Sequence, residues 1–305
     1  MSAPTISRAP ERLAASPELP DVLPPMRIRH GVTGFLHRYP TIAVGGALLV
    51  LLVLIAVFAP LMWTVDPTAL APARRTRPPS AQFWFGTDML GRDIYSRVLY
   101  GARVSLTIGF CVAILASVAG LVIGLASGFV RWADGLIMRM MDGLMSIPPI
   151  LLAVALMALT RASVGNVVMA ITIAEIPRVS RLVRGVVLSL REQLYVEAAV
   201  AAGTRTPMII VRHILPNTLA PMTVQATYIC ASAMIVEAIL SFIGAGTPPT
   251  TPSWGNIMAE GRALWQVKPY IVFFPAAFLS ITVLAVNLLG DGLRDALDPR
   301  LTNRR

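Results

Sequence analysis

The chain alternates between long apolar runs and shorter polar segments. A transmembrane helix needs about 20 predominantly apolar residues, and six runs reach that length: residues 41–62, 104–130, 136–159, 167–187, 219–244 and 270–289. None of them alternates apolar and polar positions as the strands of an outer-membrane barrel do. The pattern predicts an all-α polytopic membrane protein with six transmembrane helices.

Composition agrees with this prediction and divides the chain into three parts. Only 14% of the 305 residues are charged, whereas a soluble domain carries about 25%. Residues 1–40 are polar and rich in proline and lack the pattern of a cleaved secretory signal, so a disordered cytoplasmic tail is expected there. Residues 41–103 would hold the first transmembrane helix and an extracytoplasmic loop, and residues 104–305 a five-helix core.

The distribution of basic residues predicts that both termini are cytoplasmic, because arginine and lysine collect on that side of a membrane. The net charge of +10 is therefore read as an orientation signal, and nucleic-acid binding is disfavoured. The loop of residues 63–103 goes against the trend, with six arginines. Its second half mixes charges with turn residues, which favours a short amphipathic helix on the membrane surface. A solvated loop is the alternative.

Residues 191–217, here called the polar connector, are too polar to cross a bilayer. Residues 191–202 are good helix formers, and their alanines leave little side-chain bulk. Gly203 is typical of a helix end, and Thr206 with Pro207 fits the cap and first turn of a second helix that ends before Pro216. A helix, a bend and a helix suit docking into a groove of a cytoplasmic partner, with Glu197 as one directed charge. The alternative is a surface connector without a partner.

The polar connector resembles the EAA loop of bacterial ABC importer permeases. The matching residues are Glu197, Ala198, Ala199, Gly203, Leu215 and Pro216, with His213 where the general pattern has isoleucine. The ending "RHILPN" is similar to the peptide and nickel subclass. The segments "FGTDMLGRDIYSRVLYGARVSL", "PSWGNI" and "NLLGDGLRDALDPR" also look like the C-type subunit of dipeptide, oligopeptide, nickel and glutathione importers.

This resemblance implies a function and a set of partners. The chain would be a permease subunit of an ATP-driven importer in the bacterial inner membrane. It would form half of a translocation pathway with a B-type permease, two cytoplasmic ATPases and an extracytoplasmic substrate-binding protein. The EAA residues, His213 among them, would couple it to the ATPases, with Glu197 making a charge contact and Gly203 the bend. ATP and magnesium would be bound by the ATPases, and no cofactor by this chain.

The source of energy can be argued from the residues alone. A phosphate-binding loop needs Gly-x-x-x-x-Gly-Lys followed by serine or threonine, and the only lysine, Lys268, lies in "WQVKPY". Energy must come from a partner or from an ion gradient. A gradient-coupled secondary transporter would place ionisable groups within its spans; Glu175 and Glu237 are the candidates. Glu237 is either a helix–helix hydrogen-bonding residue or part of the translocation pathway.

Three further arginines, Arg178, Arg181 and Arg184, recur at helical spacing where the fourth predicted span leaves the bilayer. This face is expected to bind either lipid phosphates or a protein partner.

Overall fold

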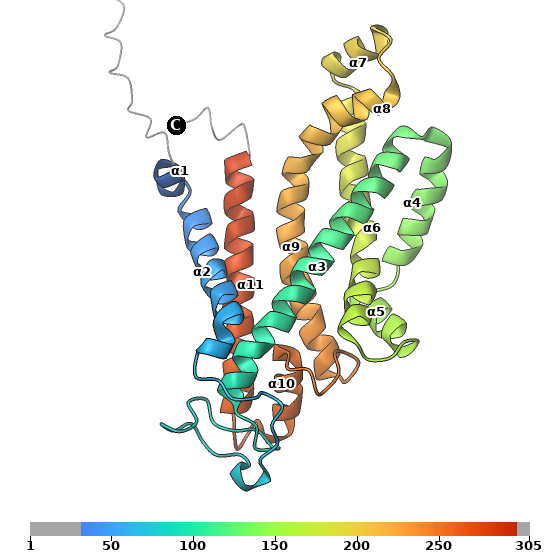
Figure 1. Cartoon of the computed structure of the whole chain (residues 1–305). Coiled ribbons are helices and arrows are strands. Elements are labelled where there is room, and N and C mark those ends of the chain that lie inside the picture. Colours follow the sequence, from blue (N-terminus) through green and yellow to red (C-terminus); the bar gives the residue numbers. More distant parts are fainter. Residues whose placement is uncertain (1–31, 298–305) are drawn as a thin grey trace, which may run out of the picture.

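The computed structural model describes residues 32–297, which are helical without a β-sheet, as predicted (Figure 1). Residues 1–31 of the predicted tail lie outside the described residues. The α-helices are α1 (Val32–Arg38), α2 (Pro40–Phe58), α3 (Ile94–Phe129), α4 (Arg131–Met145), α5 (Pro149–Ala158), α6 (Val164–Arg191), α7 (Leu194–Ala201), α8 (Thr206–Ile209), α9 (Leu215–Phe242), α10 (Trp254–Gly261) and α11 (Tyr270–Leu297).

Four helical segments of the described chain are long and apolar enough to cross a membrane: Pro40–Leu61, Ile94–Phe129, Thr206–Phe242 and Tyr270–Leu297. They coincide with the first predicted span to within one residue at each end, contain the whole of the sixth, and include nearly all of the second and fifth. The fourth predicted span lies within α6. This helix is 28 residues long, but it is not among the four segments, because Glu175, Arg178 and Arg181 interrupt its apolar residues. The bundle is therefore a polytopic membrane fold.

The third predicted span is not one straight helix. Its residues form α4 and α5, whose axes are bent by 86° at a short break. The break coincides with Pro148 and Pro149, and a residue that precedes proline is pushed out of the helical region. Pro148 accordingly has an extended ψ of 133°. Counted as one broken span, this pair is the fifth segment able to cross.

The prediction of an amphipathic surface helix before the second span is wrong. Residues 94–103 are instead the first turns of α3, a helix of 36 residues. The Asp93 side chain caps that helix by accepting a hydrogen bond of 2.8 Å from the Ser96 amide. Arg97 is 1% exposed because it is paired with Asp88 inside the protein. Residues 94–103 thus run on into the second predicted span as one helix, with the charge of Arg97 paired inside the protein.

Close helix packing along α3 depends on small residues. Gly120, Gly124 and Gly128 follow one another at four-residue spacing and face valines of α6. A Cβ on Gly124 would lie 2.6 Å from the Cβ of Val183, too close for any side chain there. Small residues let transmembrane helices approach in this way, and α3 and α6 form the centre of the bundle.

The two ends of the bundle differ in kind. Figure 1 places α7 and α8 at one end, together with α1 and the last turns of α11. The loop of residues 62–93, α10 and the turn between α5 and α6 lie at the other end. The polar connector is therefore on the same side as both described ends of the chain, which agrees with the predicted arrangement of termini relative to this segment.

Candidate functional site at the polar connector

The polar connector begins with the short helix α7 and a tight turn. The Gly203 amide donates to the Val200 carbonyl at 2.9 Å and the Thr204 amide to the Ala199 carbonyl at 3.1 Å. Gly203 has a φ of +76°, a conformation that glycine adopts without the steric penalty of a Cβ atom. The bend predicted at Gly203 is therefore present, and it folds the chain back towards α8.

The second helix differs from its prediction at both ends. Thr206 is its first residue, not its cap, and Arg205 precedes it without a side-chain capping bond. The helix also continues past Pro216, because a π-helical turn, Ile210–Ile214, joins α8 directly to α9. Asn217 follows Pro216 directly. It lies inside the continuous helix, where its amide donates to the His213 carbonyl at 2.6 Å.

Two buried residues hold the polar connector to the bundle. Val196 in α7 is 3% exposed and Ile209 in α8 is 4% exposed, and both belong to the main apolar core. Arg191 fixes the start of the segment, donating to the Gly128 carbonyl at 2.6 Å with its guanidinium over the Phe129 ring. The connector is thus anchored on its inner side.

The outer side of the polar connector is uncovered. Glu197, Ala198 and Gly203 are exposed, and Ala199 is half-buried. Glu197 has no ion pair or side-chain hydrogen bond within residues 32–297, and it borders a groove of about 470 Å³. Large apolar side chains are exposed around it: Leu194, Tyr195, Val200, Met208 and Val211. A carboxylate without a partner and exposed apolar side chains thus occur together on this surface.

The remaining predicted residues of this site lie near the joint with α9. The His213 ring is 6.0 Å from the Tyr195 ring, centroid to centroid. Leu215 is half-buried and Pro216 is exposed. His213 lies within the π-turn of residues 210–214, and Leu215 and Pro216 follow it directly. The structure therefore divides the predicted set into a surface group on α7 and its turn and a joint group at the start of α9.

The arginine face of α6 is occupied by this chain itself. Arg184 binds Asp134 of α4 through two bonds of 2.6 and 2.7 Å, and Arg181 binds Asp142 of α4 at 2.6 Å. Arg178 lies 3.1 Å from Glu175. Arg181 and Arg184 thus pair with acidic residues of α4 that are distant in sequence. A lipid or protein ligand at this face stays a prediction.

Glu237 is fully buried in α9, among hydroxyl groups. Its Oε1 atom accepts hydrogen bonds of 2.8 Å from Ser241 and from Ser253 at the start of α10. Asn256 binds the Thr247 hydroxyl at 2.8 Å within the same cluster. The cluster fastens the loop of residues 243–253 to α9. This geometry agrees with a helix-to-loop hydrogen-bonding role, and a role in the translocation pathway stays a prediction.

Comparison with known proteins places the chain in a family. Residues 116–303 match the family of binding-protein-dependent transport system inner membrane components. A probable peptide ABC transporter permease of Sinorhizobium fredii is 51% identical over 276 residues, which cover 90% of this chain and 94% of that protein. The chain belongs to this permease family.

Two other relatives and a solved structure agree. The dipeptide transport system permease DppC of Alkalihalophilus pseudofirmus is 43% identical over 85% of each chain. The glutathione transport system permease GsiD of Escherichia coli is 46% identical over 73% of this chain and 74% of that one. A chain of the inward-facing MetNI methionine ABC transporter matches with a TM-score of 0.55 at 19% identity, covering 66% of this permease and 96% of that chain. This last match shows a shared fold.

At the opposite end of the permease, four buried or half-buried charged groups form a cluster that sequence reasoning missed. Arg97 binds Asp88 at 2.6 Å and Glu260 through both of its Nη atoms. Arg92 binds Asp88 at 2.7 Å and also contacts Glu260. The cluster joins the loop of residues 62–93 to α3 and α10. The only signal in the sequence was the density of charge in "GTDMLGRD".

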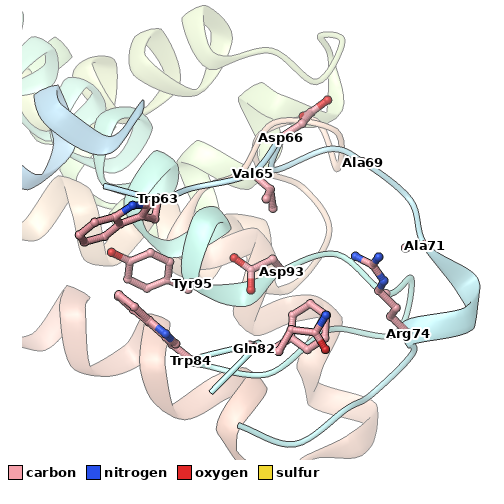
Figure 2. A pocket seen from close by; sticks show the side chains of 12 residues that line it. Trp63, Val65, Asp66, Ala69, Ala71, Arg74, Gln82, Trp84, Asp93 and Tyr95 are labelled. Carbon is pink, nitrogen blue, oxygen red and sulfur yellow. The ribbon is translucent and has the colours of Figure 1, made fainter. Parts of the chain in front are cut away.

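A cavity of about 310 Å³ opens in the loop of residues 62–93 (Figure 2). The Trp84 ring packs edge-on against Tyr95, with centroids 4.8 Å apart, and Trp63 lines the same cavity. The Thr68 hydroxyl and amide bind Asp66 and hold its pKa below the usual range. Asp93 supplies a second carboxylate to the wall. The wall of this cavity thus combines aromatic rings with carboxylates.

Proposed function

We propose that this permease is one of two membrane subunits of an ATP-driven importer for peptides or related small solutes, and that its polar connector docks on an ATPase. The observation that carries the proposal is the outer surface of α7 and α8, where Glu197 is unpaired and large apolar side chains are uncovered. Water-exposed protein surfaces rarely carry clustered apolar side chains unless a partner covers them. The names of the relatives support the substrate class.

The proposed assembly contains four kinds of chain. A second, B-type permease would complete the translocation pathway, two cytoplasmic ATPases would bind ATP and magnesium, and an extracytoplasmic binding protein would deliver the solute. Both termini would be cytoplasmic, because α1 and the end of α11 lie at the same end of the bundle as the polar connector (Figure 1). On that side of the membrane the connector would be within reach of a cytoplasmic ATPase.

Individual residues have distinct parts in this proposal. Glu197 supplies a charge contact to the ATPase, and the alanines at 198 and 199 allow its backbone to approach closely. Gly203 makes the turn that presents α7. His213, Leu215 and Pro216 belong to the joint between α8 and α9. When an ATPase moves α7 and α8, this joint would pass the movement on to α9.

Purification tests the assembly directly. A C-terminally tagged permease is isolated from its native cell in mild detergent, and every co-purifying protein is identified. Recovery of two ATPases that carry phosphate-binding loops and of a second membrane permease is the expected result. A homo-oligomer free of any ATPase would overturn the proposal.

Reversing the charge of Glu197 should weaken binding of the ATPase. A hydrogen bond to a charged group contributes about 1.5–3 kcal/mol, so Glu197→Lys is expected to raise the dissociation constant for the ATPase by about tenfold or more. Asp295→Lys is the control: it makes the same change of charge on an exposed residue of α11, outside the polar connector. Titration of the ATPase onto the reconstituted permease pair measures both. Equal affinity of the two variants would remove Glu197 from the interface.

The buried carboxylate of Glu237 favours the second candidate, a gradient-coupled carrier, because ion-coupled carriers place ionisable groups inside their spans. Glu237→Gln separates the two functions. The glutamine Oε1 can still accept from Ser241 and Ser253, so an ATP-driven importer should retain transport within about twofold and keep its fold. A carrier that moves protons through this group would lose uptake. Uptake into proteoliposomes, with ATP or with a pH gradient as the only energy source, measures this.

A further inference from the structure

The joint between the polar connector and the membrane has an unusual helical geometry. α8 and α9 form one continuous helical segment, Thr206–Phe242, of 37 residues. Within it, Ile210–Ile214 is a π-helix, and the Leu215 amide donates to the carbonyl of Ile210, five residues earlier. A single π-helical turn inside an α-helix is rare and occurs frequently at functional sites.

Pro216 accounts for the wide turn. Proline has no amide hydrogen, and its ring clashes with the carbonyl four residues earlier in a regular α-helix. A turn with five-residue spacing gives that ring room, but part of the usual hydrogen-bond ladder is lost. Bends in long helices are found at prolines and at π-turns such as this one.

The Asn217 side chain adds a hydrogen bond next to the gap that Pro216 leaves in the ladder. Its Nδ2 atom donates to the His213 carbonyl at 2.6 Å, across the weakened turn. On the next turn the Thr218 hydroxyl binds the Leu215 carbonyl at 2.8 Å. Ile214 is fully buried, so the inner face of the joint is held by packing while Asn217 lies on the exposed face.

We infer that Asn217 is a positioning residue that stiffens this π-turn, so that movement of α7 and α8 is passed to α9 and not absorbed by bending. The inference rests on the proposed function, because it needs an ATPase to move the connector. The elements on both sides of the joint are fixed in the protein. Ile209 is buried and anchors α8 before the π-turn, and α9 continues from the π-turn into the bundle.

The role of Asn217 as a positioning residue differs from that of a residue in contact with the ATPase. A residue in the ATPase interface would change binding of the ATPase. A residue that stiffens the joint should leave binding unchanged and lower the amount of solute moved for each ATP hydrolysed. The ratio of transport to hydrolysis therefore tells the two parts apart.

Two substitutions isolate the side-chain bond. Asn217→Leu keeps a similar size but removes the donor. Asn217→Thr restores a donor, since a threonine hydroxyl in a helix can bind the carbonyl four residues earlier, as Thr223 does with the Leu219 carbonyl at 2.7 Å in the same helix. Asn166→Leu is the matched control. Asn166 also donates through Nδ2 to a carbonyl, that of Arg161 at 2.8 Å, but at the other end of the bundle.

The test uses the complete importer in proteoliposomes with binding protein and a short peptide as solute. Asn217→Leu should lower transport per ATP by about fivefold, the factor that corresponds to a lost hydrogen bond of about 1 kcal/mol. Recovery of the ATPases with the permease should be unchanged. Asn217→Thr should restore most of the ratio, and Asn166→Leu should leave it unaltered.

Three outcomes would overturn the inference: an unchanged ratio in Asn217→Leu, a loss of ATPase recovery in that variant, or an equal fall in Asn166→Leu. Failure of the proposed function looks different. In that case no ATPase is recovered with the unaltered permease, whereas failure of this inference alone leaves a coupled importer that is indifferent to Asn217.

Discussion

Replacing Gly203 with proline is expected to abolish the ATP hydrolysis that substrate-loaded binding protein stimulates, while the permease remains folded and inserted. Proline fixes φ near −65°, whereas Gly203 needs a φ of +76°. Proline also removes the amide that donates to the Val200 carbonyl at 2.9 Å. The turn between α7 and α8 should therefore open and displace Glu197 from its place on the outer surface.

Local space at Gly203 makes this prediction specific to the turn. A Cβ atom there meets nothing within 4 Å, so the expected harm comes from backbone conformation and not from a clash with the bundle. Gly203→Ala should accordingly have a milder effect, since a left-handed residue with a Cβ costs about 1–2 kcal/mol.

Gly244 provides a matched control at the other end of α9. It has a φ of +85°, open space around its Cβ position and an amide that donates to the Ser241 carbonyl at 3.0 Å. Gly244→Pro should change the thermal unfolding midpoint about as much as Gly203→Pro but preserve stimulated hydrolysis. Full stimulation in Gly203→Pro, or equal loss in both variants, would contradict a coupling role for the turn.

The membrane helices could be predicted where local hydrophobicity alone determines them. α2 and α11 follow uninterrupted apolar runs. Their first residues lie within one residue of the predicted starts, and only their last residues differ by more. The bend between α4 and α5 had its signal in Pro148 and Pro149, but the apolar character of the surrounding run outweighed that signal. Hydropathy measures partition into lipid and carries no information on the direction of a helix axis.

The start of α3 could not be predicted for a different reason. Arg92 and Arg97 made the region look amphipathic and surface-bound, since isolated arginines are seldom buried. Their acidic partner Glu260 follows more than 160 residues later in the chain. Pairing of charges across that separation is a property of the tertiary fold, and it turned a predicted surface helix into the first turns of a span.

In the polar connector, some site residues could be predicted from the sequence and others could not. Glu197 and Gly203 could be singled out because a carboxylate and a glycine are distinctive residues in an alanine-rich helix. Leu194, Val200 and Met208 were missed, because an apolar residue in a membrane protein is read as buried or facing lipid. Their exposure depends on how α7 and α8 fold away from the bundle (Figure 1).

Arg97→Met is expected to destabilise the permease more than any surface substitution. Arg97 is 1% exposed and binds Asp88, itself fully buried, and Glu260. Removing one member of a buried charge cluster leaves the others uncompensated, which costs about 3–5 kcal/mol. The thermal unfolding midpoint in detergent, followed by tryptophan fluorescence, should fall markedly, and the loop of residues 62–93 should become sensitive to protease.

Arg181→Met is the control that separates burial from pairing. Its bond to Asp142 has the same length, 2.6 Å, but the two side chains are 51% and 60% exposed. An exposed pair contributes about 0–1 kcal/mol, so its midpoint should barely move. The double variant Arg97→Met/Glu260→Met should lose less than the sum of its single changes, because Arg92 and Asp88 remain as a neutral pair. Equal shifts for Arg97→Met and Arg181→Met would mean that the buried cluster does not hold this end of the permease together.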